Sequence, residues 1–164
     1  MSKEDAYCEL SFSPNLSLIA TVRRFVGEFY QRVLGDEEVA SRLVVATHEL
    51  LENAVRYSAD GQSSIRIGVR REGDEVHVAI DTRNKTKPDH REELVKLLDE
   101  MKASPDRLSF YQSLMRRSAK RTEGSGLGLG RIHAESEMDL SCDLIEDIVS
   151  LRAEARFQSK AGVQ

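Results

Sequence analysis

The chain contains no tryptophan, and only two cysteines and three prolines occur among its 164 residues. Cys8 and Cys142 stand far apart and form no CxxC pair, and the four histidines lack ligand-like spacing, so a thiolate or imidazole metal site is not expected. No apolar run approaches the roughly 18 residues of a membrane-spanning helix. The N-terminal residues also lack the apolar core of a signal peptide. These absences predict a protein of the reducing cytoplasm without a membrane partner.

The chain also lacks an excess of positive charge. Its net charge is −4, and basic residues are interspersed with acidic ones, so a nucleic-acid partner is not expected. Hydrophobic residues at 40% and charged residues at 32% are typical of a globular protein. Because there are no internal repeats or low-complexity linkers, residues 1–164 are expected to form a single domain.

Hydrophobic periodicity predicts an α+β fold. Two apolar-striped helices precede a clear β-hairpin, a helical stretch follows it, and two strands end the chain. We expect a two-layer sandwich in which helices cover one face of a mixed or antiparallel sheet. The expected elements are a strand at 6–13, helices at 16–34 and 36–58, strands at 64–71 and 75–81, a polar loop at 82–88, helices at 91–101 and from 105, a short helix at 131–136, and strands at 138–145 and 148–157.

The helix at 36–58 carries the first candidate site. Glu49, Asn53 and Arg56 are spaced i, i+4, i+7 and share one stripe, with Glu52 beside it. A carboxylate can accept a proton from a hydroxyl or orient a water molecule, and a carboxamide oxygen can bind Mg²⁺. The alternative is an ordinary stripe of polar side chains that faces solvent.

A glycine-rich segment, 124–130, carries the second candidate site. Glycines before a helix leave backbone N–H groups free to approach a phosphate closely. The segment lacks the GK[ST] ending of a P-loop, and it does not fit GxGxxG from either Gly124 or Gly126. A flexible linker is the alternative, but Leu127 and Leu129 alternate with the glycines and favour burial.

A basic cluster precedes this glycine segment. It comprises Arg116, Arg117, Lys120 and Arg121 and stands at the expected end of a helix. One interpretation is that these charges complement the helix dipole and stay solvated. The other is that they face a phosphate.

The order of these motifs resembles the GHKL ATP-binding domains, which occur in histidine kinases, type II topoisomerases and bacterial anti-sigma-factor serine kinases. The shared features are a helical ExxxN, a strand that ends in Asp, a helical insertion, and GxGLGL before a helix; together they span about residues 10–157. Within this family, the segment HELLENAVRYS (residues 48–58) and the chain length favour the branch of stand-alone anti-sigma-factor kinases and their relatives in signalling switches.

The resemblance implies ATP and Mg²⁺ as cofactors and assigns roles by position. Glu49 matches the general base, Asn53 the Mg²⁺ ligand, and Asp81 the aspartate that reads adenine. Residues 83–123 would form a lid over ATP. The phosphate-binding glycine box would comprise Gly124, Gly126, Leu127, Gly128 and Leu129.

One departure from the family concerns the residues after Asp81. The family has DxGxG there, whereas this chain has Asp81-Thr82-Arg83-Asn84-Lys85 and lacks both glycines. Asn84 tolerates left-handed backbone better than most residues, so it is a candidate to keep part of that turn beside the nucleotide.

The resemblance therefore implies a serine/threonine kinase of the partner-switch type, which transfers the γ-phosphate of ATP to a small protein such as an anti-sigma-factor antagonist domain. The eroded first glycine box leaves an alternative open: a catalytically weak or inactive binding module that sequesters a sigma factor or another regulator. A plain ATPase is a third interpretation, but it is disfavoured because the sequence shows no second domain that would use the energy of ATP hydrolysis. A homodimer is a further expectation of the family.

Overall fold

The computed structural model describes residues 5–13, 15–119 and 126–159. Strand β1 (Ala6–Phe12) is followed by helices α1 (Leu16–Leu34) and α2 (Glu37–Tyr57) and by strands β2 (Ser63–Glu72) and β3 (Glu75–Lys85). Helices α3 (Pro88–Ala103), α4 (Arg107–Ser118) and α5 (Leu127–Glu135) come next, and β4 (Asp139–Ile145) and β5 (Ile148–Gln158) complete the fold.

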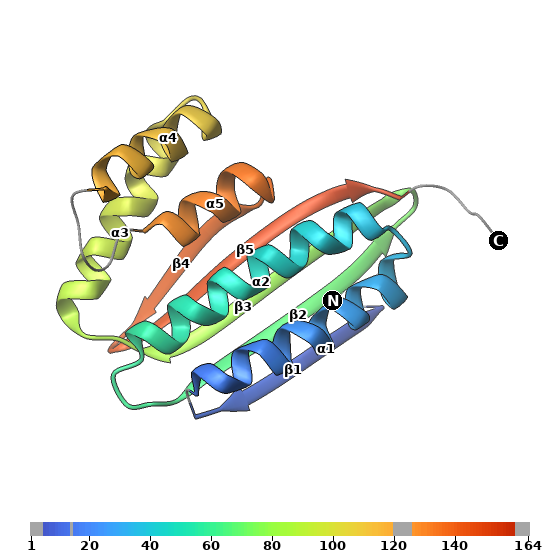
Figure 1. Ribbon diagram of the computed structural model, residues 1–164, viewed down its shortest axis with the longest axis horizontal. Helices are drawn as coiled ribbons and strands as arrows, with labels where there is room; N and C mark the ends of the chain where they lie inside the picture. The colour runs from blue at the N-terminus through green and yellow to red at the C-terminus, as the bar shows by residue number, and fades with distance from the viewer. Residues whose placement is uncertain (1–4, 14, 120–125, 160–164) are drawn as a thin grey trace.

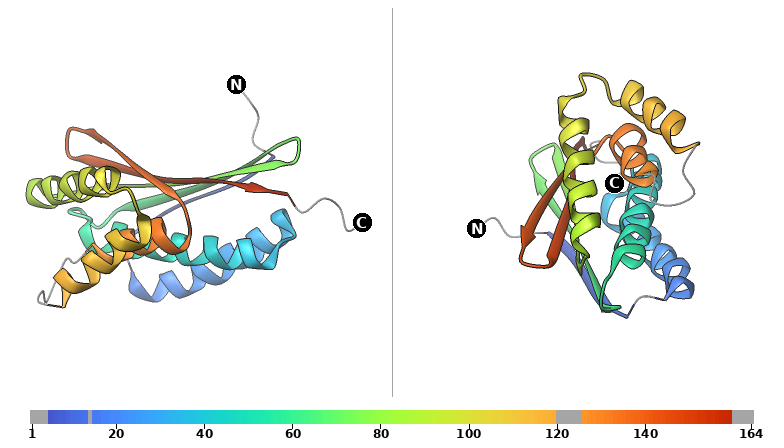
Figure 2. Two further views of the ribbon diagram at one scale, coloured as in Figure 1. Left: turned by 90° about the horizontal axis from the view of Figure 1, so that it is seen from above. Right: turned by 90° about the vertical axis from the view of Figure 1, so that its left-hand side faces the viewer.

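The five strands form one sheet in the order β1-β2-β3-β5-β4, and every neighbouring pair is antiparallel. Helices α1, α2 and α5 cover one face of this sheet (Figures 1 and 2). The predicted α+β sandwich is therefore confirmed, and the sheet is antiparallel rather than mixed. The other face of the sheet carries no helix among the described residues (Figure 2).

Helix α2 is held at its start and along its length by groups that the sequence indicates. Gly35 ends α1 with φ of 65°, and the Asp36 carboxylate accepts hydrogen bonds from the backbone of Glu38 and Val39. The inward face of α2 buries Leu43, Ala46, Leu50 and Ala54 against the sheet. This burial turns Glu49 and Asn53, which flank the buried face, toward the later helices, whereas Arg56 is exposed.

Two boundaries differ from the sequence expectations by four residues, and both lie near the candidate site. Strand β3 continues through Lys85, so the first half of the polar loop expected at 82–88 is strand: residues 82–84 pair with both β2 and β5, and Lys85 pairs with β5. Helix α5 begins at Leu127, inside the glycine segment, rather than at Arg131. In both places the regular structure, strand in β3 and helix in α5, extends into residues whose composition is typical of a loop.

The helical insertion is packed into the molecule rather than lying loose on its surface. Leu98 and Met101 of α3 and Phe110 and Leu114 of α4 belong to the same buried cluster as the sheet and α2. Helix α3 starts at Pro88, whereas α4 is capped by Asp106, whose carboxylate accepts from the Ser109 backbone. In the part of the chain that the structure describes, no helix is long and apolar enough to cross a bilayer.

Candidate functional site

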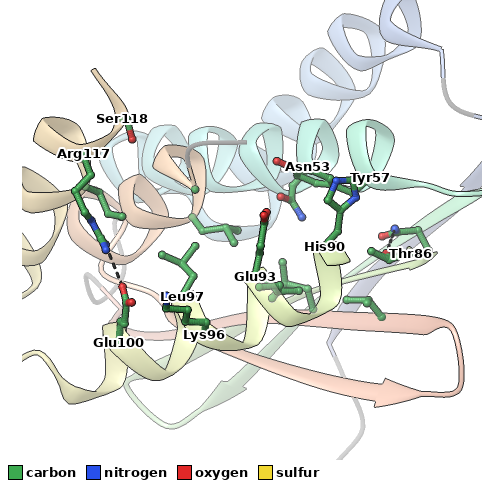
Figure 3. Close-up of a pocket in the computed structure, with 17 residues that line it drawn as sticks. Asn53, Tyr57, Thr86, His90, Glu93, Lys96, Leu97, Glu100, Arg117 and Ser118 are labelled. Atoms are coloured by element: carbon green, nitrogen blue, oxygen red, sulfur yellow. Dashed lines mark hydrogen bonds and ion pairs between the residues drawn. The ribbon is translucent and has the colours of Figure 1, made fainter. Parts of the chain in front are cut away.

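A pocket of about 360 Å³ lies between α2, α3, α4, the start of α5 and the inner face of β3 and β5. This volume is within the range of small-molecule sites, which run from about 300 to 1,000 Å³. Its floor is apolar and includes Val149 and Leu151 of β5. Figure 3 shows Thr86 and His90 at one end, and Arg117 and Ser118 at the other.

Asn53 lines this pocket, so its side chain faces a cavity rather than open solvent. Tyr57, one helical turn later, lines it too, and its ring meets the His90 ring edge-on with 4.7 Å between the centroids (Figure 3). The position of Asn53 fits the predicted role of a metal ligand, because a hard cation needs an oxygen ligand that reaches into the cavity.

The described residues contain no cluster of three or more His, Cys, Asp or Glu side chains able to hold a metal ion. Mg²⁺ is commonly bound by one or two protein oxygens together with water and substrate phosphates. The single carboxamide of Asn53 therefore fits a metal that would arrive with a nucleotide and draw most of its ligands from the phosphates.

Glu49 stands one turn before Asn53, but its carboxylate faces α5 and it is not among the residues that line the pocket. The side chain is only 11% exposed and pairs with Arg131 at 2.5 Å. Arg131 in turn donates to the Tyr111 hydroxyl at 3.4 Å. The bond to Tyr111 and the negative charge of Glu49 raise the pKa of Arg131, which stays charged. Glu49 thus links α2 to α4 and α5 through one guanidinium.

The glycine segment meets the pocket at the start of α5. Gly126 is the left-handed N-cap of that helix, with φ of 67°, and lines the pocket together with Leu129. The start of a helix carries partial positive charge that favours anions, so this end of the pocket suits a phosphate. Leu127 lies in the first turn of α5 and packs against the core. Gly124 lies outside the described residues.

Two further glycines permit close packing of α5. A Cβ on Gly128 would lie 2.4 Å from a carboxylate oxygen of Glu49, and a Cβ on Gly130 would lie 2.6 Å from Leu114. Gly128 therefore acts by letting α5 approach α2 closely beside Glu49. Gly128 does not line the pocket, so the shape of the pocket gives no support to its predicted role as a phosphate ligand.

The structure does not bring Asp81 to this pocket. Ile80 and Thr82 point toward the helices and are buried, so Asp81, between them, points to the opposite face of the sheet. There its carboxylate accepts two hydrogen bonds from Arg152 of β5, at 2.7 and 3.1 Å. Asp81 is thus separated by the sheet from the cavity that Asn53 faces.

Three polar residues at or after the end of β3 line the pocket, and the motif comparison named only Asn84 among them as a nucleotide-binding candidate. Asn84 was expected to bind the cofactor from a turn, whereas it lies on regular strand, is 8% exposed and lines the pocket. Thr86 and His90 follow it on the same wall. The sequence held one indication that Asn84 faces inward. Every second residue from Val76 to Ile80 points inward, and this alternation continues through Thr82 and Asn84, where the residues are polar and the pattern is harder to recognise.

The two described arginines of the basic cluster, Arg116 and Arg117, lie in different surroundings. Arg117 lines the pocket and pairs with Glu100 of α3 at 3.0 Å, as Figure 3 shows. Both arginines are exposed, but Arg116 does not line the pocket. Lys120 and Arg121 lie outside the described residues. Arg117 therefore fits the interpretation of a cation at the edge of the pocket, and Arg116 fits that of a solvated charge.

The Glu49–Arg131 pair gives a testable prediction for stability. We expect Arg131→Met to lower the free energy of unfolding by about 1 kcal/mol, because it leaves a nearly buried carboxylate without its charged partner while Arg131 itself is partly exposed. Urea unfolding measures the change. Arg152→Met is the matched control: it breaks an ion pair with the more exposed Asp81 and should cost less. Equal losses in both variants would contradict this account of Glu49.

The α+β sandwich therefore carries a cavity of small-molecule size between its sheet and its helices, at the start of α5. Residues 12–136 match the family model described as a histidine kinase-like ATPase domain, and the chain belongs to this family. The search of curated proteins returned no match.

Among solved structures, the chain is similar to one in the crystal structure of the SiaB-SiaC complex from Pseudomonas aeruginosa. The two chains are 17% identical, and the match covers 90% of this chain and 88% of that chain with a TM-score of 0.68. At this identity the likeness establishes a shared fold, with the same antiparallel sheet and helical layer.

Proposed function

We propose that this chain is an ATP-binding regulatory protein that acts as a serine/threonine kinase of the partner-switch type. The observation that carries the proposal is the placement of Asn53 in a pocket that the N-terminus of α5 also reaches. Membership of the histidine kinase-like ATPase family supports ATP as the ligand. The complex in which the similar SiaB chain was solved supports a small protein as the partner.

Under this proposal, the phosphates lie at the end of the pocket that Gly126 and Leu129 line, and Asn53 holds the metal that accompanies them. Bound Mg²⁺ would supply charge neutralisation for the triphosphate. The backbone N–H groups at the start of α5 would orient the γ-phosphate. Helices α3 and α4 would cover the nucleotide as the lid proposed for 83–123. Of that range, residues 83–85 instead belong to β3, and 120–123 lie outside the described residues.

Glu49 is proposed as the residue that accepts the proton of the attacking serine hydroxyl as the γ-phosphoryl group leaves ADP. In the structure this carboxylate is engaged by Arg131, so the pair has to separate before Glu49 can act. The engaged carboxylate also favours a second candidate function, in which the protein binds nucleotide and sequesters a sigma factor or another regulator without transferring phosphate.

Phosphoryl transfer separates these two functions. The protein is mixed with ATP labelled on its γ-phosphate and with a partner co-purified from the source cells, and label on serine or threonine is measured. The kinase proposal predicts labelled partner, and loss of most of that label in Glu49→Gln with ATP binding retained. ATP binding without any labelled partner would favour the sequestering module. Free phosphate released in place of labelled partner would indicate a plain ATPase.

A further inference from the structure

Asn84 and Thr86 form a hydrogen-bonded pair at the end of the pocket away from α5. They are 8% and 6% exposed, and both line the cavity. The Asn84 amide nitrogen donates to the Thr86 hydroxyl oxygen at 2.8 Å and to the Lys85 carbonyl oxygen at 3.2 Å. The pair is therefore fixed by bonds within the protein before any ligand arrives.

These bonds determine which groups of the pair remain for a ligand. A backbone carbonyl oxygen can only accept, so the Asn84 amide nitrogen must face Lys85, which settles the orientation of the carboxamide. Both amide hydrogens are then used, and the carboxamide oxygen Oδ1 is left to accept. Because the Thr86 oxygen accepts from Asn84, its own hydrogen is left to donate. A neutral acceptor and a donor thus stand side by side.

The surroundings of the pair fit a flat aromatic ligand. His90 and Tyr57 form a wall of two rings beside it, and Val149 and Leu151 provide an apolar floor. The His90 Nδ1 atom is buried and has no hydrogen-bond partner among the described residues. Orphaned buried polar atoms are uncommon, and one in a cavity wall indicates a group that a ligand would satisfy.

We propose that Asn84 and Thr86 read the edge of the adenine ring, with Oδ1 accepting from the 6-amino group and the Thr86 hydroxyl donating to N1. This inference rests on the proposed binding of ATP and names the residues that select its base. It replaces Asp81, whose carboxylate is bonded to Arg152 on the far side of the sheet. The pair lies at the end opposite Arg117 and Ser118, as Figure 3 shows for Thr86, which leaves the start of α5 for the phosphates.

Two nucleotides test this assignment by calorimetric titration in the presence of Mg²⁺: ATP, and purine riboside 5′-triphosphate, which keeps N1 but lacks the 6-amino group. The wild-type protein should bind ATP about tenfold more tightly, the effect of one hydrogen bond in a dry site. Asn84→Leu should weaken ATP about tenfold and leave the analogue unchanged. Thr86→Val should weaken both nucleotides alike, because both present N1.

Asp81→Asn is the matched control and should leave both affinities unchanged. The inference is overturned if Asn84→Leu keeps the wild-type preference for ATP, or if Asp81→Asn abolishes that preference. Failure of the wild-type protein to bind either nucleotide is a different result, since it would overturn the proposed binding of ATP and the base assignment together.

Discussion

Replacement of Asn53 by alanine is expected to remove nearly all magnesium-dependent binding of ATP. Asn53 lines the pocket from α2, and its carboxamide oxygen is the proposed ligand of a cation bound to the phosphates. An interaction with a charged group contributes up to about 3 kcal/mol, so the loss in affinity should be about 100-fold. Calorimetric titration with ATP measures it, first with Mg²⁺ and then with EDTA.

The comparison with EDTA gives this prediction its specificity. Wild-type protein should lose affinity when Mg²⁺ is removed, and Asn53→Ala should bind with the same weak affinity in both conditions. Arg56→Ala is a suitable control, because Arg56 is an exposed residue on the same helix that does not line the pocket. If Asn53→Ala retains the wild-type response to Mg²⁺, the assignment of Asn53 as the metal ligand is wrong.

Replacement of Gly126 by alanine is expected to cause a large loss of stability. At φ of 67° an alanine costs about 1–2 kcal/mol. Its Cβ would also lie 2.6 Å from the Leu97 side chain of α3, and overpacking of this kind costs a further 1–3 kcal/mol. The free energy of unfolding, measured in urea, should fall by about 2–5 kcal/mol.

Gly35→Ala is the matched control for Gly126→Ala. Gly35 has nearly the same left-handed backbone, at φ of 65°, but a Cβ there meets nothing within 4 Å. Its substitution should therefore cost only the backbone term. A second change, Leu97→Ala, should restore part of the loss in Gly126→Ala by making room. Equal losses at the two glycines would show that the contact between α3 and the start of α5 is looser than described.

The fold was largely accessible from the sequence because its helices and strands carry regular apolar patterns. Helix α1 was predicted with its observed bounds, and α2 within one residue at each end. The boundaries that failed lie where pairing partners decide the structure. Strand β3 extends through Asn84 because β2 and β5 offer hydrogen bonds on both sides, which a polar local sequence does not reveal.

The positions of the candidate site residues were easier to predict on helix α2 than on strand β3. The i, i+4 spacing of Glu49 and Asn53 predicted that they share one stripe of α2. The partner of Glu49 is Arg131, 82 residues later, which spacing cannot reveal. For Asp81 the family resemblance gave a position on the strand, whereas side-chain alternation within the extended β3 decides the face. That alternation also brings Asn84 inward.

Nuclear magnetic resonance of the ¹⁵N-labelled protein during titration with Mg·ATP tests the central claim, that nucleotide binds in the pocket between α2, α3 and α5. The account predicts saturable shifts of backbone amides at 53–57, at 84–97 and at 126–129, with small changes at His77, Asp81 and Arg152 on the opposite face of the sheet. Spectra that remain unchanged at millimolar Mg·ATP, or shifts concentrated on that opposite face, would contradict it.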